Sequence, residues 1–224
     1  MAKKIMFSDK FGLTEAVLSG RKTQTRRIIK PQPEVSERMG MVWKGYAYGI
    51  TSPAGSPFFL KDVYENFLSG TDYPQDHRYK VGEVVAVAQS YKDCGYAPAA
   101  LDRSPKDLNV VRGTLGESKG WNNKMFVRSD ACKHHICITN VRVERLQDIS
   151  DEDCIAEGIY KDDGKTHFNG YTFQITRDQY GNMLSKQWYS TPREAYAALI
   201  DRISGKGTWE SNPYVFVYEF ELIK

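Results

Sequence analysis

Tyr214-Val215-Phe216-Val217-Tyr218-Glu219-Phe220 is the run of sequence that points most directly to a β-sheet. It is rich in β-branched and aromatic residues, and it is apolar on both of the faces that an extended chain presents. Asn212-Pro213 leads into it. We therefore predict a strand over residues 214–220.

Just upstream, the sequence predicts a well-capped helix. Thr191-Pro192-Arg193-Glu194 is a capping box with proline at the first helical position. Four apolar residues follow at the spacing of one helix face: Tyr196, Leu199, Ile200 and Ile203. Gly205 is suited to end this helix.

A long strand is predicted over residues 136–146. The parity of its apolar residues switches between Ile138 and Val141, which indicates a bulge or kink near Thr139-Asn140. Two shorter strands are predicted, at residues 84–88 and 125–127.

Two more helices are predicted from their termini. Ser150-Asp151-Glu152-Asp153 combines an N-cap serine with acidic residues in the first turn, and the helix should stop at Gly158. A helix over about residues 9–19 should end at Gly20, where a left-handed residue would sit.

The remaining segments do not follow a regular pattern. Residues 34–80, rich in aromatics, and the polar residues 160–187 are interpreted as insertions, the second with a hairpin turn near 162–164 or 178–181. Residues 91–123 are interpreted as a long loop. These elements predict one α+β domain over residues 1–224, built around a small closed or strongly curved sheet.

Composition restricts the functional class only weakly. The chain has 224 residues, 41% of them hydrophobic, and a net charge of +3, which by itself does not indicate a nucleic-acid-binding protein. Its longest uncharged apolar run, residues 213–218, is too short to span a membrane, and we find no signal peptide, so we expect a cytoplasmic protein. The oligomeric state does not follow from the sequence.

No metal or cofactor is predicted. The cysteines Cys94, Cys132, Cys137 and Cys154 form no C-x-x-C motif, and the segment 132–137 lacks a second ligand pair for zinc. The histidines are scattered, and we see no glycine-rich phosphate loop or dinucleotide fingerprint.

The first candidate site is Gly20-Arg21-Lys22-Thr23-Gln24-Thr25-Arg26-Arg27. Lys22 and Thr25, three apart in a turn, can project into one pocket. Neighbouring positive charges and burial would lower the pKa of Lys22, and a neutral amine can act as the base for a threonine nucleophile. The alternative is a basic surface turn. With Lys30, the same segment would also suit a phosphate or another anion.

The second candidate is Glu157, in the last turn of the helix that ends at Gly158. A carboxylate there opposes the helix dipole by about 0.3–1 kcal/mol, so stability alone would favour a lysine or arginine. A locally unfavourable residue is a reason to suspect a function. The alternative is an exposed glutamate that tolerates this small cost.

Gly20-Arg21-Lys22-x-x-Thr25-x-Arg27 resembles the signature of the ASCH family, whose domains share the PUA-like β-barrel. Residues 81–85, the strand and helix over 141–159 and the strand over 214–220 are similar, in the same order, to other segments of that family. The whole layout looks most like the ASCH proteins of bacteriophages and prophages. The resemblance implies an α+β fold with a small PUA-like barrel, short flanking helices and two insertions.

The resemblance also implies a site. Some small bacterial members are amidohydrolases that remove the acetyl group of N4-acetylcytidine with a Lys, a Thr and a Glu, which fall on Lys22, Thr25 and Glu157. Thr23 leaves the choice of threonine open. Residues expected to contact the substrate or a nucleic acid are Arg21, Thr23, Arg26 and Arg27.

Three functions are compatible with these patterns. The first is hydrolysis of an N-acylated cytidine or a related modified nucleoside by Lys22, Thr25 and Glu157. The second is a non-catalytic module that binds RNA or a modified base, with the aromatics of the 34–80 insertion stacking on bases. The third is a phage-encoded interaction protein in which the pocket is not used.

Overall fold

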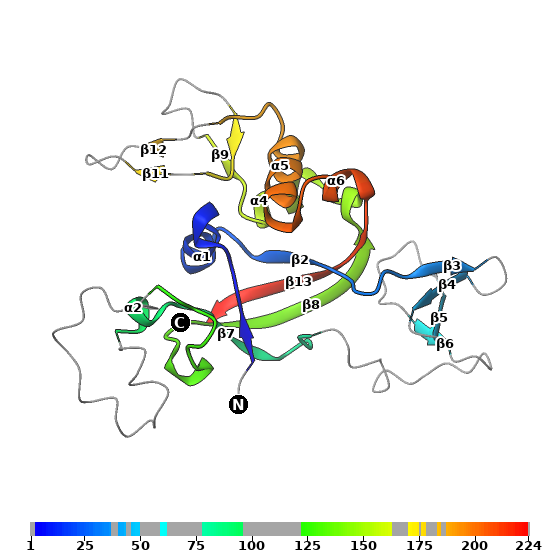
Figure 1. The fold of residues 1–224 in the computed structure, drawn as a ribbon, viewed down its shortest axis with the longest axis horizontal. Helices are drawn as coiled ribbons and strands as arrows, with labels where there is room; N and C mark the ends of the chain where they lie inside the picture. The colour runs from blue at the N-terminus through cyan, green and yellow to red at the C-terminus, as the bar shows by residue number, and fades with distance from the viewer. Residues whose placement is uncertain are drawn as a thin grey trace.

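The computed structural model has a mixed five-stranded sheet at its centre, in the order β1-β7-β8-β13-β2 (Figure 1). The residues that the structure describes are 3–36, 40–43, 46–49, 59–61, 78–95, 122–162, 170–174, 176–177, 183–184 and 187–223. The central strands are β1 (Lys4–Ile5), β2 (Gln24–Ile28), β7 (Val84–Val87), β8 (His135–Arg145) and β13 (Tyr214–Ile223).

Strand β13, the strand predicted first from sequence, lies inside the sheet between β8 and β2 and is antiparallel to both. Its register with β8 shifts where Glu219 faces Asn140 and Phe220 faces Ile138, so Thr139 is the additional residue. The predicted bulge near Thr139-Asn140 is confirmed. Only β1 and β7 pair in parallel within this sheet.

Short helices cover the sheet. They are α1 (Leu13–Leu18), α2 (Tyr91–Cys94), α4 (Asp151–Ala156), α5 (Pro192–Ser204) and α6 (Thr208–Ser211), with the 3-10 turns η1 (Asp9–Phe11), η3 (Ser129–Ala131) and η4 (Leu146–Asp148). Figure 1 shows α4, α5 and α6 together on one side of β2, β13 and β8. None of the helices in the described part of the chain is long and apolar enough to cross a membrane.

The predicted helix signals are confirmed at three termini. Ser150 accepts a hydrogen bond from the backbone of Asp153 and caps α4, and Thr191 forms the full capping box of α5. Gly20 is left-handed, with φ of 74°. The first predicted helix is divided, however, because Gly12 adopts φ of 66° and separates η1 from α1.

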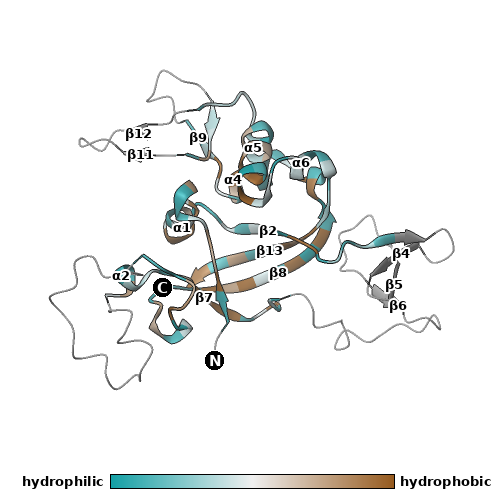
Figure 2. Ribbon diagram, in the orientation of Figure 1, coloured by the Kyte–Doolittle hydropathy of each residue, from teal (hydrophilic) through white to brown (hydrophobic). Residues whose placement is uncertain are grey.

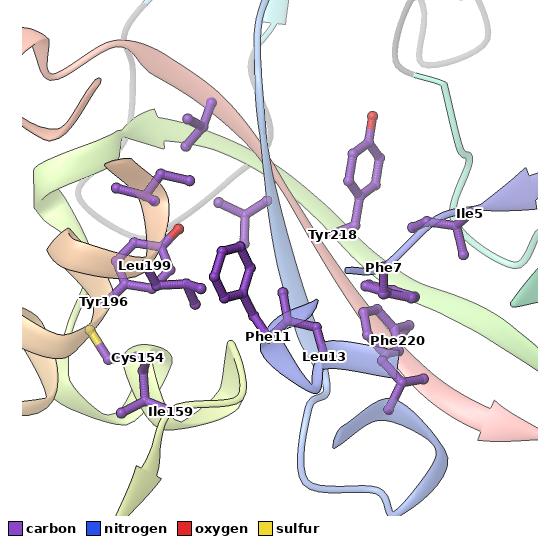
Figure 3. Packing of buried hydrophobic residues seen from close by; sticks show 14 of the residues in the cluster. Ile5, Phe7, Phe11, Leu13, Cys154, Ile159, Tyr196, Leu199, Tyr218 and Phe220 are labelled. Atoms are coloured by element: carbon purple, nitrogen blue, oxygen red, sulfur yellow. The ribbon is translucent and has the colours of Figure 1, made fainter. Parts of the chain in front are cut away.

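Both faces of β13 are buried, as its two-sided apolar pattern predicts. Val215 and Val217 are buried on one face, and Tyr218 and Phe220 are buried on the other. Figure 2 shows apolar residues concentrated along β13 and β8, and Figure 3 shows Tyr196 of α5 well separated from Tyr218. One apolar cluster includes residues from both faces.

Two local predictions are wrong. Residues 125–127 form a bend rather than a strand, because Lys4 Nζ donates hydrogen bonds to the carbonyls of Lys124, Met125 and Val127. Residues 91–94 of the predicted loop form α2, which Ser90 and Asp93 close with a capping box. Residues 96–121 lie outside the described residues.

The first insertion contains a four-stranded antiparallel sheet in the order β3-β4-β5-β6. Its strands are β3 (Glu34–Ser36), β4 (Gly40–Trp43), β5 (Tyr46–Gly49) and β6 (Phe59–Lys61). The side chains of its aromatic residues lie outside the described part, except for the buried Tyr79.

The second insertion contains two short antiparallel pairings. They join β9 (Tyr160–Lys161) to β10 (Tyr171–Thr172), and β11 (Thr176–Arg177) to β12 (Met183–Leu184). The segment is less peripheral than its polar composition suggests, because Phe173 is 3% exposed and packs edge-on against Phe11, with ring centroids 5.8 Å apart.

The α+β class is therefore confirmed. The five described strands have β1 and β2 at the two ends of their order, and a closed barrel is not seen among the described residues.

Candidate functional site

The backbone after α1 brings Lys22 to the end of α4. The left-handed Gly20 turns the chain, and the Lys22 amide then donates to the carbonyl of Ala16 at 2.8 Å. The amide of Thr23 donates to the carbonyl of Ala156 at 2.9 Å. Residues 20–23 are thus held between two helices before β2 begins.

Lys22 forms a buried ion pair with Glu157. Its Nζ donates to the Glu157 backbone carbonyl and to the carboxylate Oε2, each at 2.6 Å. The two side chains are only 2% and 5% exposed. Burial lowers the pKa of Lys22, although the carboxylate of Glu157 acts in the opposite direction.

Glu157 is buried rather than exposed, so the alternative of a tolerated surface glutamate is wrong. Its unfavourable place at the C-cap of α4 is offset by two cations, because its second oxygen, Oε1, accepts from Arg26 Nη1 at 3.2 Å. Lys22 and Arg26 therefore hold the carboxylate from two directions.

Arg26 is at the centre of a wider charge network. Its side chain is 0% exposed, and Nη2 lies 2.6 Å from both Glu144 Oε1 and Asp153 Oδ2. Arg142 contacts the same two carboxylates and also Glu219. The expectation that Arg26 belongs to an open anion site is wrong, because acidic residues from β8 and α4 already neutralise it.

Asp153 is adapted to this network. Burial acts to raise the pKa of its carboxyl, but the hydrogen bond and charge of Arg26 outweigh it, and Gln24 and Arg142 add to the effect. The resulting pKa lies below the usual value of 3.8.

Thr25 is placed differently from the expected turn. It lies within β2, where alternation puts it on the opposite face from Arg26, directly across from Tyr218 on β13. Thr25 is 5% exposed, whereas Thr23 is exposed at the surface, which favours Thr25 of the two threonines. No hydrogen bond joins the Thr25 hydroxyl to Lys22 or Glu157 among the described residues.

Lys22 nevertheless reaches toward the face on which Thr25 lies. Its Nζ is 5.8 Å from the centroid of the Phe7 ring, and that ring packs against Phe220, which shares a face of β13 with Tyr218. The ammonium group therefore lies between the carboxylate of Glu157 and the aromatic side of the sheet. Phe7 was not recognised from sequence, because it lies outside any regular element.

The remaining basic residues of the motif separate. Arg21 Nη1 donates to the carbonyl of Gly158 at 2.5 Å and so supports the end of α4. Arg27 Nη2 donates to the carbonyl of Met6 at 2.6 Å, and its guanidinium carbon lies 5.8 Å from the centroid of the Phe7 ring. Arg27 also lines a cavity.

This cavity, which we name the cationic cavity, has a volume of about 550 Å³. Its basic lining residues are Lys4, Arg27, Lys30 and Arg78. Its aromatic lining residues are Tyr79, Phe216 and Tyr218. The other lining residues are apolar, and no acidic residue of the described chain is among them. Sequence reasoning missed Arg78, whereas Tyr79 belongs to the aromatic residues of the 34–80 insertion that were expected to stack on bases.

Cys94 and Cys132, which lie far apart in the sequence, are buried in the same small apolar cluster. A hydrogen bond from Cys94 lowers the pKa of Cys132 to about 6, and the same bond raises the pKa of Cys94. Within the described ranges, no group of three or more potential metal-ligating His, Cys, Asp or Glu residues is found.

Comparisons with known proteins add no relative. A scan of protein-family models and searches of curated proteins and of solved structures return no match.

Proposed function

We propose that this chain is an ASCH-type protein with a PUA-like arrangement of its sheet, and that it hydrolyses an N-acylated cytidine or a related modified nucleoside. Lys22, Thr25 and Glu157 are the proposed catalytic residues. The observation that carries the proposal is the buried Lys22–Glu157 pair, formed by residues 135 positions apart in the chain. Two ionisable groups in such an environment are frequent at catalytic sites.

In the first step, the Thr25 hydroxyl oxygen attacks the acyl carbon of the substrate. Transfer of a proton from Lys22 to Glu157 along their 2.6 Å bond gives the neutral amine, which then accepts the Thr25 proton. Burial of Lys22 favours its neutral form. The carbon–nitrogen bond breaks, and the exocyclic nitrogen leaves as an amine after taking a proton from Glu157, so that Lys22 is again an ammonium and Glu157 again a carboxylate.

In the second step, water hydrolyses the acyl-threonine ester. Glu157 accepts a proton from water, the acid is released and Thr25 regains its proton. Arg27, on the same face of β2 as Thr25, is suited to stabilise the oxyanion. The substrate must move a side chain such as Phe7 to reach Lys22, because Lys22 is 2% exposed.

The second candidate is a non-catalytic module that binds RNA or a modified base. It is favoured by one observation: Lys22 and Glu157 are hydrogen-bonded to each other, and among the described residues neither is hydrogen-bonded to the Thr25 hydroxyl. In this case the pair is a structural ion pair, and the aromatic residues beside Arg27 stack on a base.

Hydrolysis of N4-acetylcytidine by the purified protein separates the two candidates. Turnover that is lost in Lys22→Ala, Thr25→Ala and Glu157→Gln, and retained in Thr139→Ala, supports the hydrolase. Thr139 is the matched control, because it is an exposed threonine of the same sheet with no part in the proposed site. A folded wild-type protein that does not release cytidine contradicts hydrolysis of this substrate and favours the module.

A further inference from the structure

Several basic residues near the sheet but outside the cationic cavity are paired with carboxylates. Arg26 and Arg142 are surrounded by carboxylates, and Lys22 and Lys124 each pair with one. Within the described residues, none of the four basic residues that line the cavity forms an ion pair. Positive charges that converge without a counter-charge favour the binding of an anion.

The donors of these residues are not equally available. Lys4 Nζ donates to three backbone carbonyls, so it contributes charge but has no hydrogen left to donate. Arg27 uses Nη2 for the carbonyl of Met6 and keeps its other N–H groups. Lys30 and Arg78 are exposed, and neither side chain has a hydrogen-bond acceptor among the described residues. Arg27, Lys30 and Arg78 can therefore donate to one ligand.

The aromatic residues give the same cavity a second property. Tyr79 and Tyr218 pack edge to face, with ring centroids 5.3 Å apart, and Phe216 lies 6.1 Å from Tyr218. A volume of about 550 Å³ is in the range of pockets that hold a small organic ligand. A cavity with both aromatic surface and unpaired cations fits an anion that carries a planar ring.

We propose that the cationic cavity binds the phosphate of a nucleotide through Arg27, Lys30 and Arg78, with the attached nucleoside against Phe216, the least buried of its aromatic lining residues. This deepens the proposed function and rests on it for the identity of the planar group. Thr25 faces Tyr218 across the strands, so the cavity adjoins the proposed nucleophile. The phosphate belongs either to a mononucleotide or to a nucleic-acid strand, and the two sources share this chemistry.

Calorimetric titration of the wild-type protein tests the proposal without requiring turnover. The ligands are cytidine, cytidine 5′-monophosphate and a short single-stranded RNA. We expect the monophosphate to bind at least about tenfold more tightly than cytidine at low salt, because its phosphate can accept charge-assisted hydrogen bonds from Arg27, Lys30 and Arg78. Equal affinities of all three ligands would overturn the proposal.

The variant Lys30→Gln/Arg78→Gln assigns the binding to this cavity. It should lower the affinity for phosphate-bearing ligands by about tenfold or more and that for cytidine by less than about twofold. Lys10→Gln/Arg128→Gln removes the same charge elsewhere and should retain wild-type binding. An equal loss of affinity in both double variants would contradict binding of the phosphate in the cationic cavity. If the first double variant does not fold, Lys30→Gln alone provides the test at an exposed position.

The titration with single-stranded RNA identifies the source of the phosphate. Binding of RNA but not of the monophosphate, with the same dependence on Lys30 and Arg78, supports a nucleic-acid strand as the ligand, and its affinity should fall steeply with salt. Hydrolysis of N4-acetylcytidine with no preference for phosphate contradicts this inference alone. Phosphate-dependent binding without hydrolysis contradicts the proposed activity alone.

Discussion

Lys22 Nζ donates to both the backbone carbonyl and the carboxylate of Glu157, each at 2.6 Å, although 135 positions separate the two residues. One interaction therefore ties the turn after α1 to the C-terminal end of α4. Because both side chains are almost completely buried, neither charge can be solvated if the other is removed. This relationship has consequences for stability as well as for the proposed chemistry.

We predict that Glu157→Ala lowers the free energy of unfolding by about 3–5 kcal/mol, because it leaves the buried Lys22 without its counter-charge. The double variant Lys22→Met/Glu157→Leu should lower the free energy of unfolding by less than the sum of the losses measured in Lys22→Met and in Glu157→Leu. Urea denaturation gives both values. Asp130→Ala is the matched control, since its pair with Arg128 is also 2.6 Å long but exposed, and should cost less than about 1 kcal/mol. A loss in the double variant equal to the sum of the two single losses would contradict an energetic coupling between Lys22 and Glu157.

The lowered pKa of Asp153 predicts that the folded state loses stability in acid. Its pKa is lower in the folded protein than the usual 3.8, so its charged form stabilises the folded state above that value. This stability is lost as the pH falls through the lower, folded-state pKa. Asp153→Asn should therefore weaken the dependence of stability on pH below about pH 4, relative to wild type. Denaturation midpoints between about pH 2 and pH 6 measure this effect, with Asp130→Asn as the control. An unchanged slope in Asp153→Asn would show that the network does not depend on this carboxylate.

The burial of Phe173 predicts that the second insertion contributes to the main hydrophobic core. It is 3% exposed and packs against Phe11, so Phe173→Ala should lower the free energy of unfolding by about 3–5 kcal/mol. Phe126→Ala removes the same side chain from a position that is 66% exposed and should cost less than about 0.5 kcal/mol. Similar costs for the two variants would be incompatible with this packing.

The capping box of α5 is expected to contribute measurably to the free energy of unfolding. Thr191 accepts from the backbone of Glu194, so Thr191→Ala should cost about 1 kcal/mol in thermal or urea unfolding. Ser8 is at the N-cap of η1 but makes no capping hydrogen bond with its side chain, so Ser8→Ala should be nearly neutral. A larger loss in Ser8→Ala than in Thr191→Ala would reverse this assignment.

Features with a local cause were predictable from sequence. The bulge at Thr139, the caps at Ser150 and Thr191 and the left-handed Gly20 all depend on residues within a few positions of one another. Ile203 is a residue for which such local reasoning fails. It continues the apolar face of α5, but it is 43% exposed because the helix there extends beyond the core.

Features with a distant cause were not predictable. Residues 125–127 have the composition of a strand, but their carbonyls are bound by Lys4, more than a hundred positions away. The basic motif after Gly20 looked like an exposed anion site, because Glu144 and Asp153, which neutralise Arg26, come from other parts of the chain. Their positions selected Lys22 and Glu157 separately and the family resemblance placed them in one site, but their direct hydrogen bond is a finding of the structure.

The central claim is that Thr25 is a nucleophile activated by the Lys22–Glu157 pair. The most direct measurement is to mix the protein with N4-acetylcytidine, quench rapidly with acid and search the protein by mass spectrometry for an added acetyl group. We predict one acetyl group on Thr25 of the wild-type protein, and none in Thr25→Ala, Lys22→Ala or Glu157→Gln, because the first step needs the nucleophile and both members of the pair. Release of cytidine without any acetylated Thr25, or at an unchanged rate in Thr25→Ala, would contradict the claim.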